Sequence, residues 1–279
     1  MDVDPWVVPA LVALVVWSVQ RVFTKAALST LSTPQFYLLS ASLSLPVYLP
    51  MLFLDPPRAA AFVPALGVSA FMAVAFGVTT EALRRGPLGR VSPITGVAPA
   101  LTAVLAVMLL HEQAPPLRLL GITLAIGAVV LLGYRCTCEA TKRGWLSLTI
   151  AALLLQGLGA FLAKAVVTPF GPSALLVTSA GVQMGVGSVL LRRSGGTFPR
   201  PTTPLLRWTF LVLVLAALAT IGYLWALSVG PASAVVPLVA TSPALAGVVG
   251  AIVLKEPRSR MQYWGIGLGM FAAALLALG

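Results

Sequence analysis

The chain has 279 residues, of which 59% are hydrophobic and only 9% are charged, and its formal net charge is +11. A soluble globular protein carries about 25% charged residues, so this composition excludes a soluble domain and indicates a protein that lies mostly in lipid. The basic residues fall between apolar stretches, where they set membrane orientation and meet anionic headgroups. We therefore expect the lipid bilayer as a partner, and no nucleic acid.

A helix that spans a bilayer needs about 20 mostly apolar residues. The sequence contains ten such stretches, separated by segments rich in Pro, Gly, Ser and charged residues. The longest polar gap inside the chain runs from Arg192 to Arg207, too short for a soluble domain. We predict an all-α integral membrane protein with ten transmembrane helices, at about 6–25, 34–54, 60–83, 87–110, 116–134, 145–168, 171–191, 207–229, 231–254 and 261–279.

The first stretch is expected to be a retained helix. No basic residue precedes it and no clear small-residue cleavage site follows it, as a signal peptide would require. Cys136 and Cys138 lie in a polar segment, and with His111 as the single histidine they supply too few ligands for a metal site. No nucleophile–base arrangement or paired carboxylates stand out either. We therefore expect no metal, no cofactor and no enzymatic activity.

Residues 86–133 recur, without a gap, as residues 230–277. About sixteen of the 48 aligned positions are identical at this offset of 144. Upstream, Lys25 matches Lys164 at an offset of 139, so the repeated unit contains five predicted helices. A self-match of this length marks a duplicated structural unit. We predict two five-helix repeats, at residues 1–138 and 139–279; because five is odd, the second must cross the membrane in the opposite sense.

The basic residues are divided unevenly between the two sides of the membrane. About fourteen of the 18 lie in or beside the loops after the first, third, fifth, seventh and ninth stretches, whereas Arg58 and Arg118 lie on the other side. By the positive-inside rule, the fourteen face the cytoplasm and both termini face the periplasm.

Several short motifs follow one another along both halves of the chain. They are Trp17-Ser18, Phe23 and Lys25, Ala82-Leu83, Gly86-Pro87, Pro99-Ala100-Leu101, Glu112 and Gly121-Ile122, with Ala226-Leu227, Pro243, Glu256 and Gly265-Ile266 in the second half. In these motifs the chain resembles the drug/metabolite transporter superfamily, and specifically its EamA-type ten-helix exporters. The resemblance covers essentially the whole chain. It implies a basket of ten helices around a central cavity, with the helices at 116–134 and 261–279 packed to one side. It also implies export of amino acids, drugs or other small metabolites across the bacterial inner membrane, although many relatives are expected to keep both termini in the cytoplasm.

The first predicted helix carries a polar stripe that includes Trp17, Gln20 and Arg21, spaced to share one helix face. Arg21 lies about 22 Å along this helix at about 1.5 Å per residue. It either extends to the nearer membrane interface or lines a wet cavity. Gln20 and Trp17 lie deeper, which favours the cavity. We predict all three as substrate-binding residues.

Other polar groups lie within or at the edges of the apolar stretches. Gln156 and Lys164 share a helix face, and Lys164 is the repeat partner of Lys25. The two lysines either anchor helix ends or form the electropositive mouths of one pathway. Glu81 is the only acid well inside the edge of an apolar run, and it can pair with Lys25 or Arg21. We predict Gln156 as a substrate-binding residue, and Lys25, Glu81 and Lys164 as gate or charge-pair residues.

Two pairs of prolines occupy equivalent positions in the two repeats. Each proline removes a backbone donor, which is tolerated at membrane depth beside a cavity or a hinge. They either produce packing kinks or form hinges that border the site, and we predict hinges. Aromatic and hydroxyl side chains elsewhere either fill the core or complete the pocket, and we predict the pocket. The hinge prolines are Pro93, Pro99, Pro237 and Pro243, and the pocket residues are Thr79, Tyr223, Trp225 and Thr241.

Together these patterns predict a secondary transporter, a monomer or weak dimer, that exports small metabolites by alternating access. The mainly basic charges of Arg21, Lys25 and Lys164 favour solutes with a carboxylate, such as zwitterionic amino acids, over organic cations. Two alternatives remain open at this stage. One is a passive facilitator of small solutes, and the other is a membrane-embedded lipid-handling protein.

Overall fold

The computed structural model describes residues 4–27, 31–85, 94–113, 115–132, 144–198, 204–242, 245 and 260–278. Within these ranges all regular secondary structure is helical. The first repeat contributes α1 (Val7–Ala27), α2 (Thr33–Tyr48), α3 (Met51–Leu54), the 3-10 turn η1 (Ala59–Ala61), α4 (Phe62–Arg85), α6 (Ala98–Leu109) and α7 (Pro116–Leu132). The second contributes α8 (Trp145–Phe170), α9 (Ser173–Arg193), α10 (Pro204–Val229), α11 (Ala232–Ala240) and α13 (Arg260–Leu278).

These elements correspond to the ten predicted stretches and confirm the all-α membrane fold. Five segments are long and apolar enough to cross a bilayer, and four more are shorter apolar helices. The stretch predicted at 34–54 is divided, because α2 ends at Tyr48 and the short α3 begins after Pro50. Large apolar side chains point outward, as lipid requires; Phe53 is 85% exposed and Val63 is 80% exposed.

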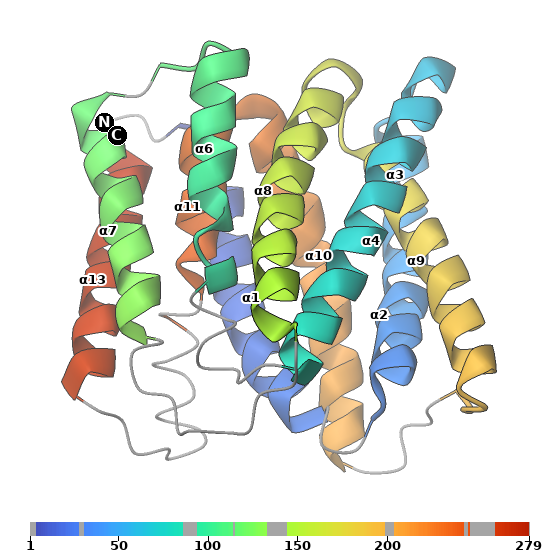
Figure 1. Ribbon diagram of the computed structural model, residues 1–279. Coiled ribbons are helices and arrows are strands. Elements are labelled where there is room, and N and C mark those ends of the chain that lie inside the picture. The colour runs from blue at the N-terminus through green and yellow to red at the C-terminus, as the bar shows by residue number, and fades with distance from the viewer. Residues whose placement is uncertain are drawn as a thin grey trace.

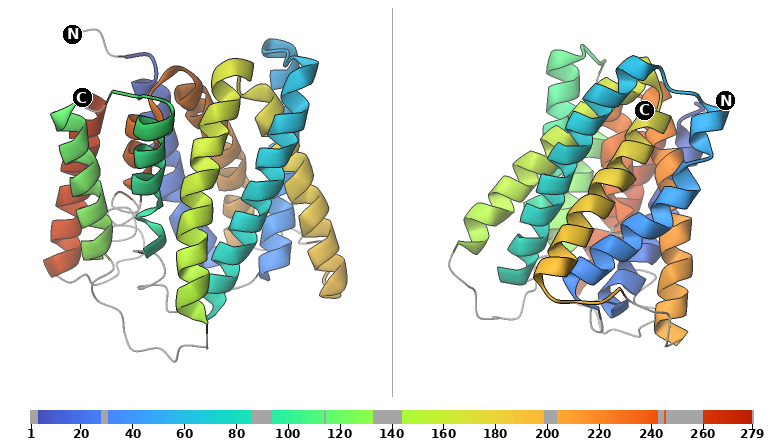
Figure 2. Two further views of the ribbon diagram at one scale, coloured as in Figure 1. Left: turned by 45° about the horizontal axis from the view of Figure 1, so that its top comes forward. Right: turned by 90° about the vertical axis from the view of Figure 1, so that its right-hand side faces the viewer.

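The two repeats are inverted with respect to each other. In Figure 1, α7 runs down the page and its counterpart α13 runs up it beside α7. The helices α2, α6 and α7 pack against their own counterparts α9, α11 and α13, while α1 packs against α10 and α8 packs against α4. Exchanging the two repeats leaves this set of neighbours unchanged, as a two-fold axis requires. The α7–α13 pair lies at one edge of the bundle, as the resemblance implied (Figures 1 and 2).

Local sequence explains several helix boundaries. Ser32 and Gln35 form a capping box at the start of α2, and Pro34 lies in its first turn, where the missing N–H is not needed. Glycines with positive φ flank α8, at +78° for Gly144 and +79° for Gly171. L side chains rarely adopt this left-handed backbone, so glycine permits the sharp changes of direction on both sides of the helix.

The end of the bundle where α1 begins and α13 ends is densely packed (Figure 1). Leu227, Val235 and Leu238 are fully buried there, and Trp6 is 4% exposed. Gly230 makes this packing possible, since a Cβ atom at that position would lie 2.5 Å from the Trp6 ring. We call this region the terminal plug, defined by Trp6, Leu227, Gly230, Val235 and Leu238. Four of its residues, Trp6, Leu227, Val235 and Leu238, belong to one buried apolar cluster.

Candidate functional site

The larger central cavity, of about 410 Å³, is lined by helices of both repeats. Four of the predicted substrate-binding residues line it, namely Trp17 of α1, Thr79 of α4, Gln156 of α8 and Tyr223 of α10. Its wall is largely apolar or aromatic and is completed by Met72, Ala75, Phe76, Ala98, Pro99, Thr102, Ala160, Gln183 and Val236.

Hydrogen bonds fix the polar side chains on the α4–α8 wall of this cavity. The Gln156 amide donates to the Thr79 hydroxyl at 2.7 Å, and that hydroxyl donates to the Ala75 carbonyl at 2.7 Å. On α6, the buried Thr102 hydroxyl donates to the Gly157 carbonyl at 2.8 Å. These contacts join three helices around the cavity and hold its hydrogen-bonding groups in defined positions.

Trp17 and Tyr223 form an aromatic wall between α1 and α10. Their ring centroids lie 5.0 Å apart at an interplanar angle of 51°. The indole Nε1–H of Trp17 also donates to the Ala216 carbonyl, at 3.4 Å. A tilted aromatic pair at this separation contributes about 0.5–1.5 kcal/mol beyond area burial. The indole is thus held from both its face and its edge.

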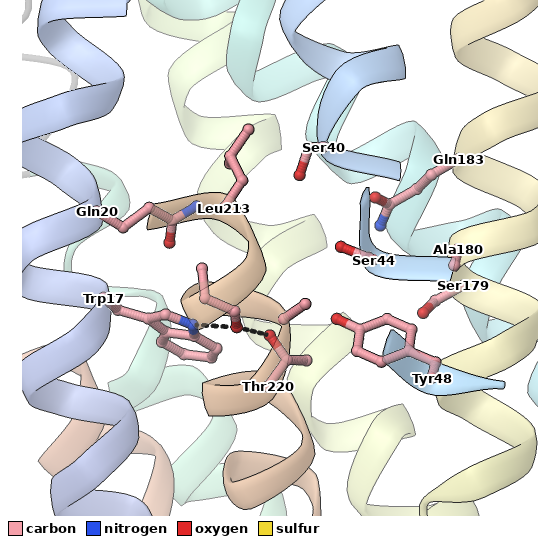
Figure 3. Close-up of a pocket in the computed structure, with 12 residues that line it drawn as sticks. Trp17, Gln20, Ser40, Ser44, Tyr48, Ser179, Ala180, Gln183, Leu213 and Thr220 are labelled. Carbon is pink, nitrogen blue, oxygen red and sulfur yellow. Dashed lines mark hydrogen bonds between the residues drawn. The ribbon is translucent and has the colours of Figure 1, made fainter. Parts of the chain in front are cut away.

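A second cavity, of about 250 Å³, lies between α1, α2, α9 and α10 (Figure 3). It shares Trp17 and Gln183 with the larger cavity, and the predicted residue Gln20 lines it. Hydroxyl side chains dominate the remainder of its wall, contributed by Ser40, Ser44, Tyr48, Ser179 and Thr220. Sequence reasoning missed this cavity and Gln183, although Gln183 interrupts an apolar stretch as Gln156 does.

Of the predicted hinge prolines that the structure describes, Pro99 lines the larger cavity and Pro237 does not. Residues 96–97 form a turn, and α6 begins at Ala98, so Pro99 occupies the first helical turn, where its missing N–H breaks no intrahelical bond. Pro237 lies inside α11, and both prolines line a small void next to Ile122. The helix interruption beside the cavity is the arrangement tolerated at membrane depth. Pro93 and Pro243 lie outside the described residues, and the hinge role remains a prediction for all four.

The comparisons with known proteins agree with this architecture. Residues 4–134 and residues 143–278 each match the EamA-like transporter family. The chain belongs to this family. A crystal structure described only as that of a protein is similar over 99% of this chain and 98% of its own, with a TM-score of 0.79 and 13% identity, which shows the shared fold. No curated protein matches the chain in sequence.

In this EamA-like transporter, Lys164 lies inside the bundle, with 8% of its surface exposed. Its ammonium group donates to the carbonyls of Leu227, at 2.8 Å, and Gly230, at 2.6 Å, where α10 ends. Both carbonyls lack intrahelical partners at a helix C-terminus, where positive charge is favourable. Lys164 therefore contacts the end of α10, and its role as a gate or charge-pair residue remains a prediction.

Glu112 holds the other side of the same turn. Its two carboxylate oxygens accept the backbone N–H groups of Ala232, at 2.8 Å, and Ser233, at 2.9 Å, at the start of α11. A carboxylate satisfies the unpaired donors of a helix N-terminus and complements its dipole. Glu112 and Lys164 therefore fix the α10–α11 turn, which carries Gly230 of the terminal plug.

Three further predicted residues, Trp225, Thr241 and Glu81, are not among the described residues that line the two cavities. Trp225 is 41% exposed on the outer face of α10, and Thr241 is buried, with its hydroxyl donating to the Leu238 carbonyl at 2.7 Å. Glu81 accepts a hydrogen bond from Arg85 at 2.6 Å, one helical turn away on α4. The side chains of Arg21 and Lys25 lie outside the described residues.

Proposed function

We propose that this EamA-like chain is a secondary transporter that exports small metabolites, and amino acids in particular, by alternating access. The supporting observation is the central cavity, which is lined by helices of both repeats. An inverted pair of units permits two equivalent conformations that open to opposite faces, so rocking one unit against the other transfers a solute.

The dimensions and lining of the larger cavity suit a small metabolite. Its volume, about 410 Å³, falls within the about 300–1,000 Å³ typical of small-molecule sites. Trp17 and Tyr223 provide apolar contact for a solute side chain, while Gln156 and Thr79 provide directed hydrogen bonding. Arg21, on the same helix as Trp17, remains a predicted substrate-binding residue.

We place the protein in the bacterial inner membrane with both termini in the periplasm, on the strength of the distribution of basic residues. In this orientation the terminal plug lies on the periplasmic side, where we propose that it blocks release of the solute. We propose no cofactor and no enzymatic role for the chain.

Purified protein in proteoliposomes tests this function. We expect saturable uptake of a labelled neutral amino acid above that of empty liposomes, and little uptake of a quaternary ammonium dye. Arg21→Ala should reduce amino-acid flux if Arg21 lines the transport pathway. Robust dye transport without amino-acid flux would contradict the proposed substrate class.

The two alternative functions give different results in the same vesicles. A passive facilitator would move solute only down its gradient, with no effect of pH or membrane potential. A lipid-handling protein would move a fluorescent lipid between leaflets without solute flux. The secondary-transporter proposal predicts solute flux that responds to pH or membrane potential, and no protein-dependent lipid movement.

A further inference from the structure

The smaller cavity between α1, α2, α9 and α10 has a strongly polar wall inside a membrane protein. Gln20 extends from α1 on one side, and Ser40, Ser44 and Gln183 extend from α2 and α9 on the other (Figure 3). Their polar groups point into the space between these helices (Figure 3). Polar groups facing a lipid-embedded interior are costly unless a solute or water satisfies them, so this wall indicates a site for a hydrogen-bonding ligand.

The chemistry of this wall is neutral and bifunctional. Each serine hydroxyl both donates and accepts hydrogen bonds, and each glutamine amide presents one acceptor oxygen and two N–H donors. None of the described residues that line either cavity carries a formal charge. Such a wall can hold an ammonium group through its oxygens and a carboxylate through its donors at the same time.

The absence of charge among these described lining residues bears on selectivity. A solute with a net charge would leave that charge uncompensated in a site of low dielectric, which is strongly unfavourable. A zwitterion carries its own counter-charge and needs only hydrogen bonds from the wall. The polar cavity therefore favours solutes of zero net charge that have a compact polar head.

The larger cavity complements this polar one. Met72, Phe76 and Val236 give it apolar surface, and it meets the smaller cavity at Trp17 and Gln183. Trp17 is fixed by Ala216 and Tyr223, so the boundary between the two is well defined. An amphipathic solute can thus place its head in one cavity and its apolar tail in the other.

We propose that the two cavities form one divided binding site, in which Gln20 and Gln183 determine head-group specificity for net-neutral zwitterions and the larger cavity takes the apolar tail. This inference rests on the proposed transport function. Beyond that function, the inference places the head group of the solute in the α1–α2–α9–α10 cavity and attributes head-group selectivity to the neutral amides of Gln20 and Gln183.

The experiment compares three solutes that differ only at the head: leucine, its decarboxylated amine and its deaminated acid. Inhibition of labelled leucine uptake is measured in proteoliposomes for the wild type, Gln20→Glu, Gln183→Glu and Gln113→Glu. Gln113 is exposed outside both cavities, so it controls for added negative charge. In the wild type we expect leucine to compete at least about tenfold better than the amine or the acid, a difference of about 1.4 kcal/mol.

Gln20→Glu and Gln183→Glu should improve inhibition by the amine relative to leucine by about tenfold or more, because the new carboxylate compensates the ammonium group. Gln113→Glu should leave this ratio at the wild-type value. Unchanged amine-to-leucine ratios in both cavity variants, with leucine flux intact, would overturn the head-group assignment while the transport function stands. Absence of leucine flux in the wild type would instead contradict the proposed function itself. Gel filtration identifies variants that misfold. As a second control, Gln20→Asn and Gln183→Asn keep a neutral amide and should retain the wild-type ratio of amine to leucine inhibition.

Discussion

Replacing Lys164 by methionine tests whether the buried lysine stabilises the α10–α11 turn. Methionine keeps a similar length and removes the ammonium group, so the Leu227 and Gly230 carbonyls lose their shared donor. Both of these residues are buried, and water cannot readily replace the lost contacts. The expected result is a less stable protein, because each unsatisfied buried carbonyl costs about 1–3 kcal/mol.

The net effect is smaller than the sum of these losses. Burying a lysine charge has its own desolvation cost of several kcal/mol, which the substitution removes. We therefore expect a net loss of about 2 kcal/mol, which corresponds to a decrease in Tm of about 4–8 °C for a chain of this size class. Lys164→Gln, which keeps a neutral donor, should lose less.

The measurement is thermal unfolding of the purified protein in detergent, followed by intrinsic tryptophan fluorescence. Arg193→Met is the matched control, because Arg193 is an exposed cation in the last turn of α9 and its loss should cost only a few tenths of a kcal/mol. A Tm for Lys164→Met within about 1 °C of both the wild type and this control would refute the reasoning. It would show that the lysine reaches water instead of stabilising the helix terminus.

Three further predictions follow from single positions. Gly157→Ala should lower the Tm by several degrees, because its Cβ would lie 2.8 Å from the Ala98 carbonyl and 2.9 Å from Leu101; Gly181→Ala, with nothing within 4 Å, should leave it unchanged or raise it. Thr102→Val should destabilise the α6–α8 contact by about 1 kcal/mol through loss of the hydrogen bond to Gly157, measured by the same unfolding assay. A carboxy-terminal alkaline phosphatase fusion should be active and a fluorescent-protein fusion at the same point dark, and the reverse result would overturn the orientation while leaving the inverted repeat intact.

Much of the fold could be predicted from the sequence because lipid imposes a simple rule on helix length. Continuous apolar stretches of bilayer length gave the helices, and the offset of 144 gave the inverted repeat. The divided segment around α2 and α3 was not anticipated, since an apolar run alone does not show that α2 ends at Tyr48 and that α3 begins after Pro50. Helix boundaries of this kind depend on backbone hydrogen bonds that composition does not report.

The candidate site was only partly predictable. Helical spacing correctly grouped Trp17 with Gln20, but Trp225 was chosen by residue type alone. Trp225 lies two residues from Tyr223, and positions i and i+2 on a helix point in different directions, so both cannot face one cavity. The polar cavity had a usable signal in Ser40 and Ser44, which are four residues apart on one face.

The contacts of Lys164 lay beyond sequence reasoning. Its partners are backbone carbonyls 63 and 66 residues away, and backbone groups carry no residue-type signal. Only the packing of α8 beside the end of α10 brings them together. The same holds for Glu112, whose partners are backbone N–H groups 120 and 121 residues away.

Counterflow across proteoliposomes tests the central claim most directly, namely that solute moves through the central cavity by alternating access. Vesicles preloaded with unlabelled leucine should take up labelled leucine faster than empty vesicles. Ala160→Trp, which fills the larger cavity, should abolish this uptake, while Leu154→Trp, at a position 51% exposed on the same helix, should retain it. Equal counterflow in Ala160→Trp and the wild type, or no acceleration by preloaded leucine in a wild type that still takes it up, would contradict the account.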